Sequence, residues 1–223
     1  MRRRLSTLLI ILVFLTGLSL ILYPSISNYI NSQNQSRAIA NYAEDVAGLS
    51  REEYEQLLEQ AKSYNVRLSA VGSNWKLSQE ELNQYNEILN INKNGMMGYI
   101  EIPKIQCSLP IYHSTDEAVL QKNVGHLPGS SLPVGGESTH SVLSGHRGLP
   151  SAKLFSDLDK VETGDKFIIR VLNETLTYEV DQILIVLPSE MDALNIEEGQ
   201  DLCTLVTCTP YGVNSHRLLV RGH

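Results

Sequence analysis

An uncharged apolar run at the N-terminus constrains this chain more than any other feature of the sequence. It extends from Leu5 to Tyr23 and directly follows Arg2, Arg3 and Arg4. A helix of about 20 apolar residues spans the hydrocarbon core of a bilayer, and flanking basic residues favour the cytoplasmic side. The sequence therefore predicts a single membrane anchor, with everything after Tyr23 outside the cytoplasm.

A cleaved signal peptide is the alternative interpretation of this run. The run is long for a signal core, and the segment Pro24-Ser25-Ile26-Ser27 lacks an Ala-x-Ala cleavage site. An uncleaved anchor is therefore favoured over a signal peptide.

Length and charge restrict the possibilities for the rest of the chain. A chain of 223 residues suits one domain with accessory segments. A net charge of -7 argues against a nucleic-acid binder, which would present a basic face. No Gly-rich phosphate loop and no dinucleotide fingerprint is present.

Residues 28–94 are polar and helical in character. Ser50 with Glu53, and Ser78 with Glu81, form two capping-box patterns, which predict helices to about Ser63 and Leu89. Residues 65–76 between these helices are predicted as a loop, and it contains one aromatic residue, Trp75. A further helix is predicted over 37–47.

From residue 95 onward, short β-rich runs alternate with Gly, Pro and Asp, which is typical of an all-β sandwich or barrel. The predicted organisation is an anchor over 1–27, a helical segment over 28–94 and a mainly β domain over 95–223. Residues 123–137 are predicted as a loop. Strands are predicted over 97–102, 109–112, 140–144, 166–171, 176–187, 202–208 and 216–221, and short helices over 116–122 and 152–158.

The chain has three cysteines, so at least one thiol cannot pair within it. Cys208 ends a β-rich run and is followed at once by Thr209-Pro210, which places it where a rigid strand meets a loop. Cys203 has the opposite parity on the same strand and is expected to pack on the other face. Cys107 has no assigned role, and pairing between Cys107 and Cys203 stays open.

A thiol becomes a good nucleophile when an imidazole or a cation lies beside it. The loop after Cys208 predicts a hairpin whose returning strand brings Arg217 next to the cysteine. Arg221 lies about four residues deeper and is expected to point away. A guanidinium in this place would suit a developing oxyanion, although a surface charge on the hairpin is the plain alternative.

Among six histidines, His146 has the most suitable context, because it follows a β-rich run and is flanked by Gly145 and Gly148. His126 is the second choice. The sequence has no Cys-x-x-Cys or His-x-x-x-His spacing for a metal, and no Gly-x-Ser-x-Gly nucleophile elbow. No metal site is expected.

These motifs resemble the sortases, the cysteine transpeptidases of the Gram-positive cell surface, and class C, the pilus-assembling type, in particular. The likeness runs from about Gly95 to His223 almost without a break. It rests on Thr204-Leu205-Val206-Thr207-Cys208 with Arg217 nine positions later, Ser144-Gly145-His146-Arg147-Gly148, Gly98-Tyr99-Ile100-Glu101-Ile102-Pro103-Lys104, Leu109-Pro110-Ile111-Tyr112, Ser131-Leu132-Pro133-Val134-Gly135-Gly136 and Gly148-Leu149-Pro150-Ser151-Ala152.

The resemblance implies a closed eight-stranded β-barrel in which Cys208 is the nucleophile, His146 the acid/base and Arg217 the transition-state arginine. It implies cleavage of a Leu-Pro-x-Thr-Gly-type sorting signal between Thr and Gly, with no cofactor. The acyl group would then pass to an amine, which in class C is typically a pilin lysine. Anchoring to a cell-wall amine of peptidoglycan, release by a cysteine hydrolase, and an inert membrane-anchored adaptor are the alternatives.

Two departures from the class C pattern stand out. The lid of that class carries Asp-Pro-aromatic, whereas this chain has Gly72-Ser73-Asn74-Trp75. Trp75 is the lid candidate, but an acid–Arg217 latch is not expected, and packing of Trp75 on the barrel is the alternative. Many class C enzymes also continue into a second membrane helix, whereas this sequence ends at His223.

Overall fold

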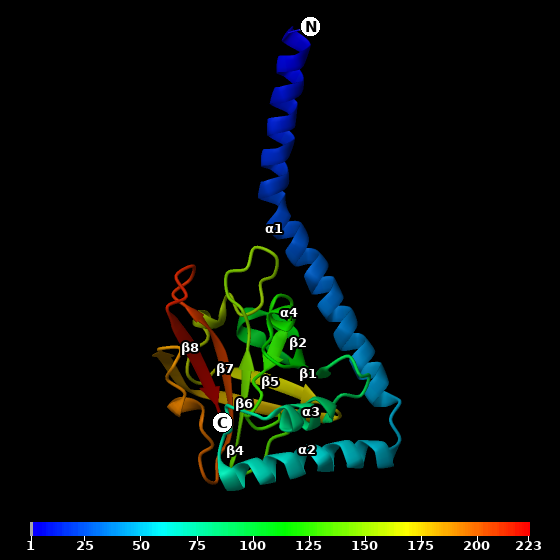
Figure 1. Cartoon of the computed structure of the whole chain (residues 1–223), viewed down its shortest axis with the longest axis vertical. Coiled ribbons are helices and arrows are strands. Elements are labelled where there is room, and N and C mark those ends of the chain that lie inside the picture. Colours follow the sequence, from blue (N-terminus) through cyan, green and yellow to red (C-terminus); the bar gives the residue numbers. More distant parts are fainter. Residues whose placement is uncertain (1) are drawn as a thin grey trace.

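The computed structural model describes residues 2–223, and it consists of a closed β-barrel with a long helix extending from it (Figure 1). Helix α1 is continuous from Arg2 to Ala47 and includes the whole apolar run. The part of α1 that is apolar enough to cross a membrane is not buried against the rest of the chain. The predicted boundary at residue 27 therefore falls inside one helix.

Both predicted capping boxes are present. Ser50 caps α2 (Arg51–Val71) with Glu53, and Ser78 caps α3 (Gln79–Glu87) with Glu81. In each box the serine hydroxyl accepts the N3 backbone N–H while the N3 glutamate accepts the N–H of the serine.

Helix α2 is longer than the sequence pattern indicated, so the prediction of a loop over 65–76 was wrong in its first half. Asn65 is buried and exchanges two hydrogen bonds with the backbone of Leu132, at 2.7 and 2.9 Å. Leu68 is buried on the same side. These tertiary contacts hold the last turns as helix until Gly72, whose φ of 83° ends it.

Eight strands form the barrel in the order β1-β2-β3-β4-β7-β8-β6-β5, and β5 pairs with β1 to close it. The pairs β2–β3 and β4–β7 are parallel, and the other neighbours are antiparallel. The strands are β1 (Met96–Ile102), β2 (Cys107–His113), β3 (Val124–His126), β4 (Thr139–Ser144), β5 (Lys166–Val171), β6 (Glu174–Val186), β7 (Asp201–Thr209) and β8 (His216–Gly222).

Two sequence predictions in the barrel were wrong. Strand β3 lies within the predicted loop 123–137; it is only three residues long, and neighbouring strands rather than its own pattern define it. No α-helix forms over 152–158. Leu154 has a φ of 39°, and the N–H of Phe155 donates to the carbonyl of His146 instead of continuing a helix.

The barrel interior and the helical segment share one hydrophobic core. Ala61 of α2 and Tyr85 of α3 belong to the same buried cluster as barrel residues such as Phe167. Helix α1 joins the barrel through Tyr42, whose hydroxyl donates to the carbonyl of Met97 and accepts the N–H of Leu172. The helical segment is therefore part of the folded body.

His126 lies fully buried between α3 and the barrel. Its Nε2 is 2.8 Å from the carbonyl oxygen of Ser131, and its Nδ1 is 2.9 Å from the hydroxyl of Tyr85. A neutral ring satisfies both contacts, with Nε2–H donating to Ser131 and Nδ1 accepting from Tyr85. Burial lowers the pKa of His126 to about 4, and burial also lowers the pKa values of His113 and His140.

We predict that the free energy of unfolding decreases between about pH 6.5 and pH 4. In this window the unfolded chain binds protons that the folded chain does not, and His126 alone contributes roughly 3 kcal/mol of lost stability by pH 4. Urea unfolding of the detergent-solubilised chain at several pH values measures the slope. His126→Gln is expected to flatten it and His223→Gln to leave it unchanged; equal slopes for all three chains would contradict the assignment.

Candidate active site

Three neighbouring strands bring the predicted site residues to one level of the barrel. Cys208 on β7 is directly opposite Arg217 on β8. On the other side of β7, the parallel strand β4 ends with Ser144 opposite Val206, so His146, two residues further, lies level with Cys208. The ends of β4, β7 and β8 thus place an imidazole, a thiol and a guanidinium in one row.

The segment that carries His146 is fixed to β7. The N–H of Gly145 donates to the carbonyl of Val206 at 3.0 Å, and the hydroxyl of Thr207 donates to the carbonyl of Gly145 at 2.7 Å. A Cβ at Gly145 would lie 2.6 Å from the ring of Phe155, so only glycine allows this close approach. The backbone on either side of His146 is therefore held, because Phe155 also binds the His146 carbonyl.

Strand parity separates the cysteines, as predicted. Cys203 is fully buried in the barrel core, whereas Cys208 is half-buried on the outer face with Val206. All three cysteines are unpaired in the described chain, so Cys107 and Cys203 do not form a disulfide. Burial raises the pKa of Cys107 to about 12 and that of Cys203 well above its ordinary value, which keeps both as unreactive thiols.

Arg217 is a cation without a carboxylate partner among residues 2–223. Its Nη1 donates to the backbone carbonyls of His216 at 3.0 Å and Asn214 at 3.3 Å. Its rival Arg221 instead binds both Asp181 and Glu197. Arg221 is thus committed to a structural ion-pair network, while the charge of Arg217 remains available to a ligand.

The sequence analysis missed Glu117, at the start of α4 (Glu117–Leu120). Its Oε2 lies 3.4 Å from Nε2 of His146. Hydrogen bonds from Gln121 and His146 lower the pKa of the Glu117 carboxyl, so it is ionised at neutral pH. Glu117 and His146 are 29 positions apart in the chain, and no local pattern could have connected them.

The second-choice histidine lies away from this row. His126 is fully buried, with its ring between Tyr85 and Ser131. Its contacts are those of a structural residue.

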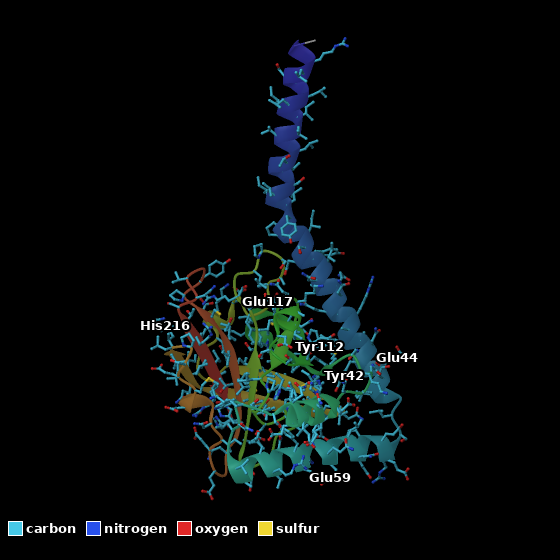
Figure 2. All side chains as sticks on the ribbon, in the orientation of Figure 1. Tyr42, Glu44, Glu59, Tyr112, Glu117 and His216 are labelled. Atoms are coloured by element: carbon cyan, nitrogen blue, oxygen red, sulfur yellow. The ribbon has the colours of Figure 1, made fainter. Side chains whose placement is uncertain are left out.

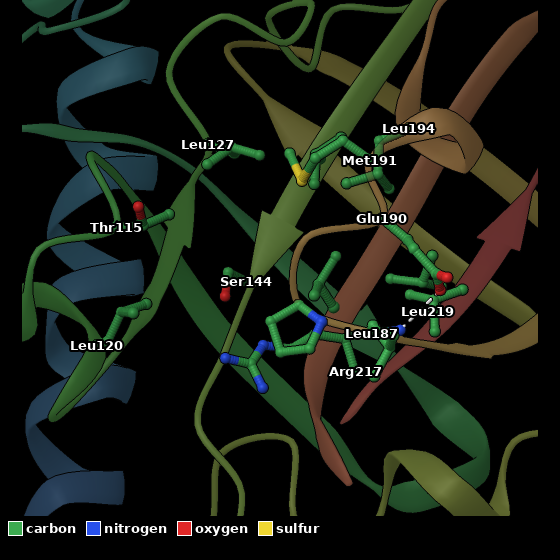
Figure 3. A pocket seen from close by; sticks show the side chains of 14 residues that line it. Thr115, Leu120, Leu127, Ser144, Leu187, Glu190, Met191, Leu194, Arg217 and Leu219 are labelled. Carbon is green, nitrogen blue, oxygen red and sulfur yellow. Dashed lines mark hydrogen bonds between the residues drawn. The ribbon is translucent and has the colours of Figure 1, made fainter. Parts of the chain in front are cut away.

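A cavity of about 240 Å³ opens on the outer face of the barrel beside the row. Figure 3 shows Thr115 and Leu120 on one side of it and Met191 and Leu194 on the other, with Ser144 between them. Its lining is mostly apolar, and it includes Arg217, which is opposite Cys208 on the neighbouring strand. The lining residues are Thr115, Leu120, Leu127, Val142, Ser144, Val186, Leu187, Pro188, Glu190, Met191, Leu194, Val206, Arg217 and Leu219.

Trp75 packs against an outer apolar cluster formed by Val142, Leu194 and Leu219, three residues that also line the cavity. Its loop is held to the barrel by a hydrogen bond from the N–H of Asn74 to the carbonyl of Gly129. Trp75 itself is not among the lining residues. Its function as a lid stays a prediction.

A thiol lies level with an imidazole and a guanidinium, beside an apolar groove on a closed barrel, and this arrangement suits nucleophilic catalysis by a cysteine. The model of the sortase domain matches residues 100–223. The chain belongs to the sortase family, whose members are cysteine transpeptidases.

Solved structures make the likeness more specific. The chain is 55% identical to sortase C1 from Streptococcus agalactiae, with a TM-score of 0.82 over 84% of this chain and 97% of that one. For sortase C-1 from Actinomyces oris the identity is 46% and the TM-score 0.71, over 76% and 97%. The predicted resemblance to class C sortases is confirmed.

Curated relatives are more distant. Sortase D of Bacillus subtilis is 33% identical over 51% of this chain, a match that spans only 54% of that relative. Sortase A of Bacillus anthracis is 26% identical over 99% of this chain and 95% of that protein.

We predict that Cys208 is the only thiol that reacts rapidly with iodoacetamide at pH 8. A thiol of pKa about 12 is ionised to roughly one part in 10⁴ at this pH, so Cys107 reacts slowly and the buried Cys203 more slowly still. Intact-mass measurement should show one fast adduct. Cys208→Ser is expected to slow it by at least about 100-fold, whereas Cys107→Ser leaves it unchanged; a fast adduct on the Cys208→Ser chain would refute this order.

Proposed function

We propose that this chain is a transpeptidase that cleaves Leu-Pro-x-Thr-Gly-type sorting signals between Thr and Gly and joins the acyl group to a pilin lysine. The observation that carries the proposal is the row of Cys208, His146 and Arg217 at the ends of three adjacent strands. Each of the three stands at the position of the matching family motif, and the row ends at an apolar groove.

In the proposed reaction, the thiol of Cys208 passes its proton to His146, and its sulfur attacks the Thr carbonyl. The carbonyl oxygen becomes negative, and Arg217, which has no competing carboxylate among the described residues, stabilises it. His146 gives a proton to the Gly amine as the C–N bond breaks, which leaves a thioester. The incoming amine then gives a proton to His146 as its nitrogen attacks, and Cys208 leaves as the thiolate, which can take this proton back from His146.

Glu117 has a positioning role in this scheme. Its carboxylate lies 3.4 Å from Nε2 of His146, where it stabilises the imidazolium that must protonate the leaving amine. The side chain of Glu117 is 68% exposed, so solvent weakens this attraction. We assign this contact the role of orienting the imidazole ring.

The groove supplies the donor subsite. Its lining by Leu127, Met191, Leu194 and similar side chains suits the Leu and Pro of a sorting signal. Arg217 and Ser144 at the other end lie next to the row where the Thr carbonyl must be placed.

A pilin acceptor is favoured over a cell-wall amine by what the similar enzymes are reported to do. One is the sortase C1 of GBS pilus island 1, at 42% identity. Another is a Streptococcus pneumoniae sortase C whose structure is described in terms of pilin substrate specificity, at 43% identity. Peptidoglycan anchoring and hydrolytic release keep the same first half-reaction, and the acceptor distinguishes them.

We also propose that the apolar part of α1 anchors the chain in the cell membrane, with the barrel outside the cytoplasm. The helix is long and apolar enough to span a bilayer, and Arg2, Arg3 and Arg4 precede it. Residues 1–27 then form the anchor, 28–94 the helical segment and 95–223 the catalytic barrel, although α1 links the first two without a break.

We predict that the full chain forms a thioester on Cys208 when it is incubated with a Leu-Pro-x-Thr-Gly peptide. Intact mass detects the acyl group, and water, a cell-wall amine and a pilin lysine are compared as acceptors. Cys208→Ala should abolish the adduct, and His146→Ala and Arg217→Ala should each lower kcat/KM by at least about 100-fold. Cys107→Ala is the matched control and should behave as the parent chain.

The outcomes separate the rivals. If the folded chain forms no thioester, the proposed enzyme is refuted, and the membrane-anchored adaptor is the remaining alternative. A thioester that only water resolves supports a hydrolase, and preference for the cell-wall amine supports peptidoglycan anchoring.

We predict that Trp75→Ala speeds modification of Cys208 by a sorting-signal analogue severalfold and leaves the iodoacetamide rate unchanged. Trp75 packs on Val142, Leu194 and Leu219 of the groove, so its removal widens the path of a peptide more than that of a small reagent. Rates are followed by intact mass, with circular dichroism as the folding control. Unchanged rates for both reagents would leave Trp75 as a packing residue only.

A further inference from the structure

The end of the barrel that carries the active-site row faces the same direction as the N-terminal half of α1. Figure 1 shows the β7–β8 hairpin and the loop after β4 at this end, while α2 lies along the opposite end. Figure 2 shows Glu117 and His216 toward the first end and Glu59 at the second.

Helix α1 fixes the distance between this end and the apolar run. The side chain of Asn28 accepts the N–H of Lys153 at 2.8 Å, and that of Asn31 donates to the carbonyl of Ser151 at 2.7 Å. At 1.5 Å per residue, these contacts lie about 8 and 12 Å beyond Tyr23, where the run ends. The headgroup layer on each side of a bilayer is roughly 5–7 Å thick. A membrane span that ends at Tyr23 would therefore bring the loop 148–152 to the edge of this layer.

The loop after β4 and the β7–β8 hairpin form one surface. The ring of Tyr211 covers Gly148, where a Cβ would lie 3.1 Å from it. The guanidinium of Arg147 sits over the same ring, 5.7 Å from its centroid, and is itself paired with Asp159. The tips of the two loops therefore lie side by side on one surface.

The two loop segments themselves carry no charged residue, and the hairpin tip exposes apolar side chains. Residues 148–152 and 202–215 contain no Asp, Glu, Lys or Arg. Tyr211 is 62% exposed and Val213 is 69% exposed at the hairpin tip. At the opposite end, α2 carries Glu52, Glu53 and other charges in its first turns. Tyrosine is enriched at membrane interfaces, because its ring is apolar and its hydroxyl polar.

We propose that the tips of these two loops, with Tyr211 and Val213 foremost, dock on the lipid bilayer that α1 enters. The proposal rests on the membrane anchoring proposed above. The bilayer is the occupant because the anchor belongs to the same chain and leads directly to this end of the barrel. Cys208 lies three residues before Tyr211, and His146 two before Gly148, so the active-site row opens at the membrane surface.

A photo-crosslinking experiment tests the contact. The full chain is placed in nanodiscs of phosphatidylcholine and phosphatidylglycerol with benzoylphenylalanine at position 213 or, as the matched control, at position 66 of α2. Val213 and Val66 are equally exposed, at 69% each. Mass spectrometry is expected to find lipid adducts at 213 and none at 66. No lipid adduct at 213, equal adducts at both positions, or adducts to protein instead of lipid would overturn the proposal.

A second measurement links docking to turnover. Val213→Asp is expected to lower cleavage of a sorting peptide tethered to the nanodisc by a lipid chain about fivefold, and to leave cleavage of the free peptide unchanged. Val66→Asp should change neither rate. Equal loss on both peptides would indicate damage to the hairpin and count against docking. The crosslink is independent of catalysis, so a chain that forms no thioester but crosslinks to lipid refutes the proposed enzyme and keeps the docking.

Discussion

The parallel pairing of β4 with β7 is the constraint on which the site depends. It sets Ser144 beside Val206, and the antiparallel return of β8 sets Arg217 beside Cys208. Because side chains alternate between the faces of a strand, a shift of one residue in either pairing would move one member of the row to the barrel interior. The bonds that join Gly145 to β7 hold this register where β4 ends.

Sequence periodicity predicted the strands and caps well, because both are local. Seven of the eight strands lie within a few residues of the predicted ranges. Strand β3 was missed because three residues are too few to show an alternating pattern. Helix α2 was predicted too short because Asn65 and its partner Leu132 are 67 positions apart in the sequence. Strand parity separated Cys203 from Cys208, but the pairing of Glu117 with His146 depends on tertiary contact alone.

Residues of the same type differ in their surroundings and in the contacts that they make. His126 is enclosed and neutral, and its contacts join α3 to the barrel, whereas His146 stands beside an exposed carboxylate. Arg221 is fixed by two acids, and Arg217 by backbone carbonyls only. In each pair, one residue is held by contacts within the barrel, and the other lies in the row with Cys208.

Because α1 is unbroken, the number of residues between its apolar run and the barrel sets an orientation as well as a distance. Each residue in an α-helix turns the chain by about 100° as well as advancing it 1.5 Å. If the helix stays rigid from Tyr23 to Asn31, adding or removing one residue between Tyr23 and Asn28 would rotate the whole barrel by about 100° around the helix axis relative to the apolar run. The number of residues between the apolar run and the barrel therefore sets the rotation of the barrel about the helix axis. Only insertions or deletions of about a whole number of helical turns would preserve this rotation.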